Sequence, residues 1–191
     1  MNWETILFIG DSITNGARSY LSFPEYAGDL LEKKTGKFWN IINLSKNGIT
    51  VAGLNKLVAE NNASLTSGNA SLAVILIGTN DAKARTDEDD FRIAYNQLVI
   101  KAKLLSQNKN VAVVKLPLFQ NGIMLPYELE MNKQIKGYNM IIGELANKHQ
   151  LMLLDPNYTA EHFFDGVHLN KEGAKHFAAQ LSELILSKRG I

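Results

Sequence analysis

The chain has 191 residues, the size of one ordinary domain, so we expect residues 1–191 to form a single domain. Hydrophobic residues make up 46% of it, which is enough for a core and excludes a disordered chain. The net charge of +1 provides no basic field for a nucleic acid, so we expect no nucleic-acid partner. Cysteine is absent, which excludes a disulfide scaffold, a cysteine nucleophile and a thiolate metal site.

The N-terminal segment lacks the features of a secretory signal. No basic stretch precedes the apolar residues 6–9, and this run is much shorter than the hydrophobic core of a signal peptide. No apolar run approaches the ~18–20 residues that cross a membrane. The sequence therefore predicts no membrane span and a cytoplasmic location, with secretion of a longer precursor as the alternative.

Five short apolar runs recur along the chain. They are rich in Val, Ile and Leu, and polar residues do not alternate with apolar ones within them. We therefore expect each run to be a strand that is buried on both faces. The runs comprise residues 6–9, 41–44, 72–77, 111–116 and 151–154.

Segments with helical spacing of apolar residues lie between and after these runs. They predict helices over residues 23–34, 91–105, 140–146 and 177–186. Acidic residues 87–90 directly precede the second of these segments, where a helix dipole favours negative charge. Alternating strands and helices are typical of a parallel sheet with helices on both faces. In such sheets, ligands bind at the carboxyl ends of the strands.

Polar residues follow four of the five runs, at the points where the strands are expected to end. If the sheet is parallel, these points all lie at one edge, so the polar side chains converge there. The residues are Asp11 and Ser12, Asn47 and Gly48, residues 78–81, and Asp155 with residues 165–168.

Ser12 follows the first run. By itself it is typical of a helix N-cap or a turn, and a catalytic nucleophile is the alternative. The Gly-x-Ser-x-Gly elbow of α/β-hydrolases is not present, because Thr14 stands where the second glycine would be. We expect the neighbouring Asp11 to be structural and to hold the loop through backbone hydrogen bonds.

Asp165 and His168 form an Asp-x-x-His pair. The two could make a surface ion pair, or His168 could flank a helix that begins near Lys171. Alternatively, the carboxylate fixes the tautomer of an imidazole whose other nitrogen faces a nucleophile. His162 lies in the same segment and is the best spare candidate for a base.

Gly48 and Asn80 also have two interpretations. Gly48 could be an ordinary turn glycine, and Asn80 could be a loop cap. An acyl-transfer site, however, needs hydrogen-bond donors aimed at a developing oxyanion, and a backbone N–H and an asparagine amide both provide them. The residue types alone leave these interpretations open.

Considered together, these segments resemble the SGNH hydrolase family, also called GDSL esterases/lipases. Four blocks occur in the family's order and span most of the chain, and their combination is specific. They are Gly-Asp-Ser-Ile-Thr-Asn-Gly at 10–16, Asn-Gly-Ile-Thr at 47–50, Gly-Thr-Asn-Asp at 78–81 and Asp-Gly-Val-His-Leu-Asn at 165–170.

The resemblance implies a flavodoxin-like three-layer α/β/α sandwich with a parallel sheet of about five strands. It also implies a serine esterase with Ser12 as nucleophile, His168 as base and Asp165 as the residue that orients His168. The oxyanion donors would be the backbone N–H groups of Ser12 and Gly48 and the side chain of Asn80. No metal or organic cofactor is required, and the partner is a small-molecule ester substrate.

We expect short acyl groups, such as O-acetyl esters of carbohydrates, because the chain is compact and shows no long apolar lid. Alternatives are a lysophospholipase or thioesterase, an acyltransferase that uses the same nucleophile, and a non-catalytic flavodoxin-like binding module. Residues 117–126 are apolar and flanked by prolines, so they form either part of a substrate pocket or a packed loop. Nothing in the sequence predicts the oligomeric state.

Overall fold

A computed structural model describes residues 3–61, 70–123 and 125–189 of the chain. Five strands form one sheet in the order β2-β1-β3-β4-β5, and all neighbouring strands are parallel. This is the flavodoxin-like order, in which the chain reverses direction across the sheet between β1 and β3. The strands are β1 (Trp3–Gly10), β2 (Phe38–Ser45), β3 (Leu72–Leu76), β4 (Val111–Val114) and β5 (Met152–Leu154).

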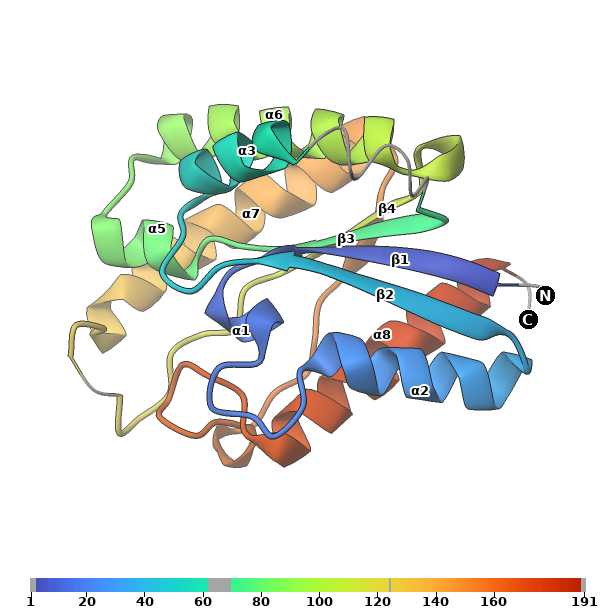
Figure 1. Ribbon diagram of the computed structural model, residues 1–191. Helices are drawn as coiled ribbons and strands as arrows, with labels where there is room; N and C mark the ends of the chain where they lie inside the picture. The colour runs from blue at the N-terminus through green and yellow to red at the C-terminus, as the bar shows by residue number, and fades with distance from the viewer. Residues whose placement is uncertain (1–2, 62–69, 124, 190–191) are drawn as a thin grey trace.

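Helices cover both faces of the sheet (Figure 1). One face carries α3 (Val51–Glu60), α6 (Glu88–Leu105) and α7 (Asn132–His149), and the other carries α2 (Phe23–Thr35) and α8 (Lys171–Arg189). The predicted three-layer α/β/α sandwich is confirmed. Two short helices, α1 (Ser12–Asn15) and α5 (Thr79–Ala84), lie at the carboxyl ends of β1 and β3. Within the described ranges, no helix is both long and apolar enough to cross a bilayer.

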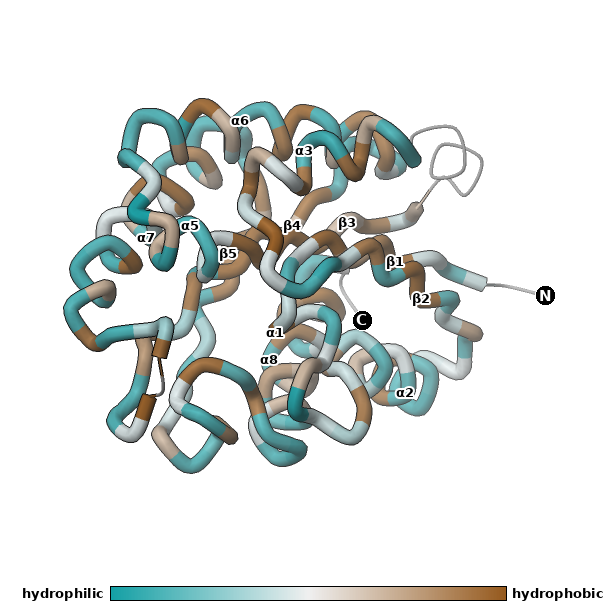
Figure 2. The backbone as a smooth tube through the Cα atoms, turned by 60° about the vertical axis from the view of Figure 1, so that its left-hand side comes forward, coloured by the Kyte–Doolittle hydropathy of each residue, from teal (hydrophilic) through white to brown (hydrophobic). Residues whose placement is uncertain are grey.

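The core lies between the sheet and the two helical layers. Figure 2 shows hydrophobic residues concentrated along the central strands and polar residues on the outer helical surfaces. Every residue of β3 and β4 is buried, and so are the last five residues of β1. The prediction that all five strands are buried on both faces is wrong for β2 and β5. These two form the edges of the sheet, where coverage by neighbouring elements is incomplete.

The predicted helices are present, but two extend well beyond the predicted segments. Helix α6 begins at Glu88, and the Asp87 carboxylate caps it by accepting a hydrogen bond from the Asp89 N–H. Helices α7 and α8 start earlier than predicted. Their first turns contain several polar residues, so apolar spacing does not reveal them. Helix α3 was not predicted, although Thr50 caps it and buried apolar residues recur along it at helical spacing.

Candidate active site

Ser12 is the first residue of α1, directly beyond the end of β1. Asp11 is the N-cap of this short helix, and its Oδ1 accepts a hydrogen bond from the Ile13 N–H at 3.0 Å. Gly10 permits the sharp turn, since a Cβ there would lie 2.1 Å from Thr14 Oγ1. The helix therefore folds back closely against the strand and holds Ser12 at the carboxyl edge of the sheet, where it is 4% exposed.

The segment that carries Asp165 and His168 forms a tight turn around the Asp165 carboxylate. Oδ1 accepts the backbone N–H groups of Val167 at 3.1 Å and of His168 at 2.8 Å. Oδ2 lies 2.8 Å from Nδ1 of the His168 ring. Gly166 adopts a φ of +79°, in the left-handed region that favours glycine, and this conformation brings the two side chains together.

Ser12 and His168 meet across 156 residues of sequence, with His168 Nε2 at 3.0 Å from Ser12 Oγ. A carboxylate can only accept, so Nδ1 carries the proton that faces Asp165. The other ring nitrogen, Nε2, then accepts from the Ser12 hydroxyl. The structure thus brings Ser12, His168 and Asp165 into the geometry in which an imidazole can take a proton from a serine.

Asp165 is held in its ionised form. Burial by itself would raise the pKa of this carboxyl, but hydrogen bonds from the backbone and ring of His168 and from the Val167 backbone keep the pKa below its usual value. A carboxylate that stays charged can fix the orientation of the imidazole and stabilise the imidazolium that forms when Ser12 loses its proton.

Asn80 lies in the first turn of α5, beyond the end of β3, and is 1% exposed. Its Nδ2 donates to the Ile49 carbonyl at 3.1 Å, and its Oδ1 accepts from the Tyr127 hydroxyl at 3.2 Å. An asparagine amide has two N–H donors, so one of them is left for a further acceptor.

Gly48 follows β2 in a loop that packs beside α1. The Lys46 N–H donates to the Gly10 carbonyl at 3.2 Å, and Asn15 Nδ2 donates to Asn47 Oδ1 at 3.0 Å. Gly48 has a φ of +76°, and a Cβ there would meet no atom within 4 Å. Backbone conformation and not crowding therefore favours glycine at this position.

Two other buried acids, Asp11 and Asp81, lie beneath this edge of the sheet. Burial raises the pKa of Asp11 to about 7, and the charge of Asp81 adds to the effect. Among the described residues, Asp11 Oδ2 has no hydrogen-bond partner, and the Ile13 N–H and, to a smaller extent, the Thr79 side chain offset only part of the burial effect. Burial likewise raises the pKa of Asp81 to about 6, although its Oδ2 accepts the Val51 N–H at 3.0 Å. The predicted backbone hydrogen bond of Asp11 is present.

His162, the spare candidate for a base, has different partners. Its Nδ1 accepts the Thr159 N–H at 3.0 Å, and its ring stacks on His176 with centroids 4.3 Å apart. Burial and the neighbouring His176 lower the pKa of His162. These contacts hold the ring against α8 and not against Ser12.

Tyr127 is a residue of this region that sequence reasoning missed. Its hydroxyl reaches Asn80, and its ring stands edge-on to His168 with centroids 6.5 Å apart. Residue 127 lies in a loop outside the four blocks, so no motif marks it. Only the folded chain brings it to a residue that is 47 positions away.

Residues 117–126 form a loop that is partly packed and partly exposed. Asn132 on α7 bonds both the N–H and the carbonyl of Phe119, and Phe119 itself is buried. The Gln120 N–H donates to the Gly166 carbonyl at 2.9 Å, which ties this loop to the Asp165 turn. Leu125 is 82% exposed, and Met124 lies outside the described residues. The loop thus supports the Asp165 turn.

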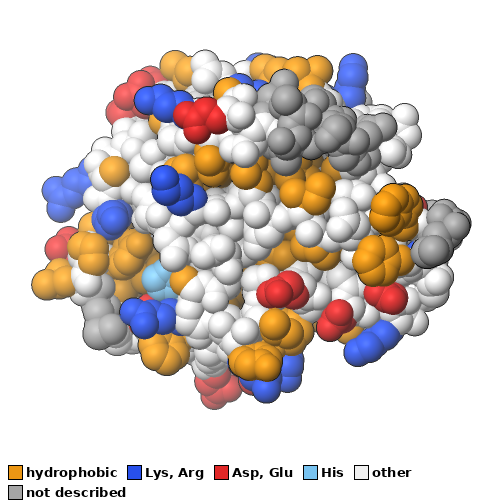
Figure 3. Space-filling view, in the orientation of Figure 1, with side chains coloured by type: hydrophobic (Ala, Val, Ile, Leu, Met, Phe, Trp, Pro, Cys, Tyr) orange, Lys and Arg blue, Asp and Glu red, His pale blue; other side chains and the backbone are white. Residues whose placement is uncertain are grey.

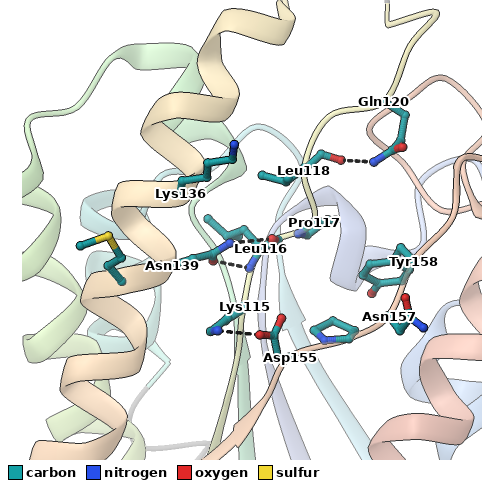
Figure 4. A pocket seen from close by; sticks show the side chains of 12 residues that line it. Lys115, Leu116, Pro117, Leu118, Gln120, Lys136, Asn139, Asp155, Asn157 and Tyr158 are labelled. Carbon is teal, nitrogen blue, oxygen red and sulfur yellow. Dashed lines mark hydrogen bonds and ion pairs between the residues drawn. The ribbon is translucent and has the colours of Figure 1, made fainter.

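Two surface cavities border this edge of the sheet. One, of about 490 Å³, lies between α7 and the segments that follow β4 and β5, and the Lys115–Asp155 ion pair lies within it (Figure 4). The other, of about 430 Å³, is lined by residues 46–50 and by α3, and it includes Gly48. In sheet order they fall on opposite sides of Ser12. The cavity that includes Gly48 is lined mainly by polar side chains, whereas the other combines polar side chains with Leu116, Leu118 and Met140.

The surface around these elements carries mixed charge. On the face shown in Figure 3, acidic and basic side chains are scattered among uncharged and hydrophobic ones. Within the parts of the chain that are described, no group of three or more His, Asp or Glu side chains is placed to hold a metal ion.

The sequence profile of the GDSL-like lipase/acylhydrolase family matches residues 8–176. The chain belongs to this family. Membership confirms the predicted family and makes the protein a carboxylic ester hydrolase. No curated protein sequence gives a significant match to the chain.

Solved structures agree with the fold. An acetylxylan esterase from Geobacillus stearothermophilus is similar, with 21% identity, a TM-score of 0.74 and coverage of 95% of this chain and 94% of that one. A lipase/acylhydrolase from Enterococcus faecalis has 21% identity, a TM-score of 0.77 and coverage of 97% and 96%. A second acetyl xylan esterase has 21% identity, a TM-score of 0.73 and coverage of 95% and 99%. At these identities the similarity establishes the shared fold.

Proposed function

We propose that the protein hydrolyses carboxylic esters through an acyl-enzyme formed on Ser12. The observation that carries the proposal is the continuous contact from Ser12 Oγ to His168 Nε2 at 3.0 Å and from His168 Nδ1 to Asp165 at 2.8 Å. His168 takes the hydroxyl proton while Oγ attacks the ester carbonyl, and it then donates that proton to the departing alcohol. A water activated by the same imidazole releases the acid and frees Ser12.

The negative charge that develops on the carbonyl oxygen must be stabilised by hydrogen-bond donors. We assign the backbone N–H groups of Ser12 and Gly48 and the free N–H of Asn80 to this role. Ser12 N belongs to the first turn of α1, where amides have no intrahelical acceptor. The left-handed Gly48 and the buried Asn80 flank Ser12 in the sheet order, from β2 and β3 respectively.

For the substrate, we propose short acyl esters of a polar alcohol, with an O-acetyl carbohydrate as the first choice. The cavity that includes Gly48 is lined mainly by polar side chains, which suit hydroxyl groups better than a long acyl chain. The two similar acetylxylan esterases have the same fold. A series of nitrophenyl esters of increasing acyl length separates this proposal from a lysophospholipase or thioesterase. An added sugar acceptor reveals an acyltransferase through the new ester.

The decisive experiment compares wild type with Ser12→Ala on a chromogenic acetyl ester. We expect the variant to lose hydrolysis and to keep its fold, because the substitution removes one hydroxyl from a helix terminus. A serine-directed phosphonate should label wild type at Ser12 alone. Labelling of a different serine would overturn the assignment of the nucleophile.

A further inference from the structure

We propose that Tyr127 is a positioning residue that holds the Asn80 amide in the orientation needed for oxyanion binding, an inference that rests on the proposed function. Its hydroxyl donates to Asn80 Oδ1 at 3.2 Å, from a loop outside the four sequence blocks. Tyr127 itself acts through Asn80, so it contributes no direct contact to the reacting atoms.

The partners of Asn80 fix which end of its amide is nitrogen. The Ile49 carbonyl can only accept a hydrogen bond, so the NH₂ group must lie on that side, at 3.1 Å. The amide oxygen then faces Tyr127, which supplies the matching donor. The side chain is therefore held at both ends, and its second N–H has a fixed direction.

The position of the Tyr127 hydroxyl is itself determined by packing of the ring. The ring meets Phe119 edge-on with centroids 5.3 Å apart, and Lys83 Nζ lies 5.8 Å from its centroid. Its edge-on contact with His168 places it over the candidate site. Burial raises the pKa of Tyr127, and the charges of Asp11 and Asp165 add to this effect. The phenol therefore stays protonated and can act as a hydrogen-bond donor to Asn80.

Loss of this hydroxyl has a definite consequence. Asn80 is 1% exposed, so Oδ1 would be left without a donor in a buried position. The amide could then rotate about its Cβ–Cγ bond, and its free N–H would lose its fixed direction. A preorganised donor stabilises a transition state because it needs no reorientation during the reaction. The loss should therefore appear in kcat and not in KM.

The test is Tyr127→Phe, which keeps the ring and removes only the hydroxyl. On a short-chain nitrophenyl ester, we expect kcat to fall about 5–30-fold, with KM changed less than about twofold. Affinity for methylboronic acid, which adds to a catalytic serine as a tetrahedral anion, should fall by a similar factor. Tyr95→Phe is the matched control, since the Tyr95 hydroxyl on α6 is buried without a hydrogen-bond partner among the described residues, and it should leave both values unchanged.

Asn80→Ala provides the second arm, in a double-mutant cycle. Because Tyr127 acts through Asn80, the double variant should be no slower than Asn80→Ala alone, which we expect to lose roughly 10²–10³-fold in kcat. An unchanged kcat in Tyr127→Phe, or effects that simply multiply in the double variant, would overturn the inference. Ser12→Ala in the same assay tests the proposed function separately. If it is inactive while Tyr127→Phe is unaffected, only the inference about Tyr127 fails.

Discussion

Asp165 and Asp11 are two carboxylates close to Ser12, and their surroundings drive their pKa values in opposite directions. Asp165 accepts three N–H groups, from Val167 and from the backbone and ring of His168, and its pKa is lowered. Asp11 accepts one N–H, from Ile13, is fully buried, and has a pKa raised to about 7. The number of donors compared with the extent of burial therefore decides whether each carboxyl pKa lies above or below its ordinary value.

This contrast assigns different tasks to the two residues. In the proposed mechanism, an Asp165 that stays charged suits the orientation of an imidazole that becomes cationic when Ser12 loses its proton. Asp11 is next to the nucleophile in sequence, but its hydrogen bond goes to the backbone of α1. Proximity to Ser12 thus does not distinguish the two acids, whereas their hydrogen-bond partners do.

The largest expected effect tests the histidine that links Asp165 to Ser12. His168→Ala removes the base and should lower kcat roughly 10⁴-fold. His162→Ala is the matched control, because that ring lies in the same segment but contacts Thr159 and His176. We expect it to keep activity within about threefold of wild type, measured on the same acetyl ester. Comparable losses in the two variants would contradict the assignment of the base.

A smaller loss is expected for Asp165→Asn. The amide can still accept the two backbone N–H groups through Oδ1, but its NH₂ group cannot accept from His168 Nδ1. The imidazole is then held in the wrong tautomer, although the base itself remains. We expect kcat to fall roughly 10²–10³-fold, less than for His168→Ala. If Asp11→Asn, assayed in parallel, loses as much activity as Asp165→Asn, the proposed difference in role between the two acids is wrong.

The smallest effect on activity, and a clear effect on stability, is expected for Asp11→Asn. Folding raises the pKa of Asp11 from 3.8 to about 7, so between these pH values the unfolded chain releases a proton that the folded protein keeps. The stability of the wild type should therefore fall as pH rises from about 4 to 7, and the loss is complete above that range. At about 1.4 kcal/mol per pKa unit, this cost reaches at most about 4 kcal/mol.

Asparagine carries no charge and can still cap α1 through its carbonyl oxygen. Denaturant unfolding at pH 5 and pH 8 should therefore show a smaller loss of stability in Asp11→Asn than in wild type. Asp81→Asn gives a reference for the second buried acid, whose pKa is raised to about 6. An identical pH dependence in wild type and Asp11→Asn would show that Asp11 is not protonated in the folded state at pH 5.

Much of the fold could be predicted from short stretches of sequence. Residues 6–9 and 72–77 are apolar without interruption, and the corresponding strands β1 and β3 lie at the centre of the sheet. The run at 41–44, which contains Asn43, was also expected to be buried on both faces, but β2 is an edge strand and most of its residues are only partly buried. A local run of Ile and Leu indicates a strand, but its place in the sheet depends on which strands pair with it.

Some residues of the candidate site could likewise be predicted from sequence motifs, and others could not. The chain order of Ser12, Gly48, Asn80, Asp165 and His168 could be read as motifs, since each sits directly beyond a strand or within a short turn. The contact of Tyr127 with Asn80 had no such signal, because it joins two loops through tertiary packing.

The sequence by itself determined the family, the alternation of strands and helices, and the set of residues proposed for catalysis, because periodicity and motif spacing are properties of neighbouring residues. Only the tertiary structure decided that Asp11 is buried enough for its pKa to be raised to about 7 and that the His162 ring packs against α8. The hydrogen bond from the Tyr127 hydroxyl to Asn80 Oδ1 was also evident only from the tertiary structure. Burial and long-range hydrogen bonds arise from the packing of distant segments, which no local pattern specifies.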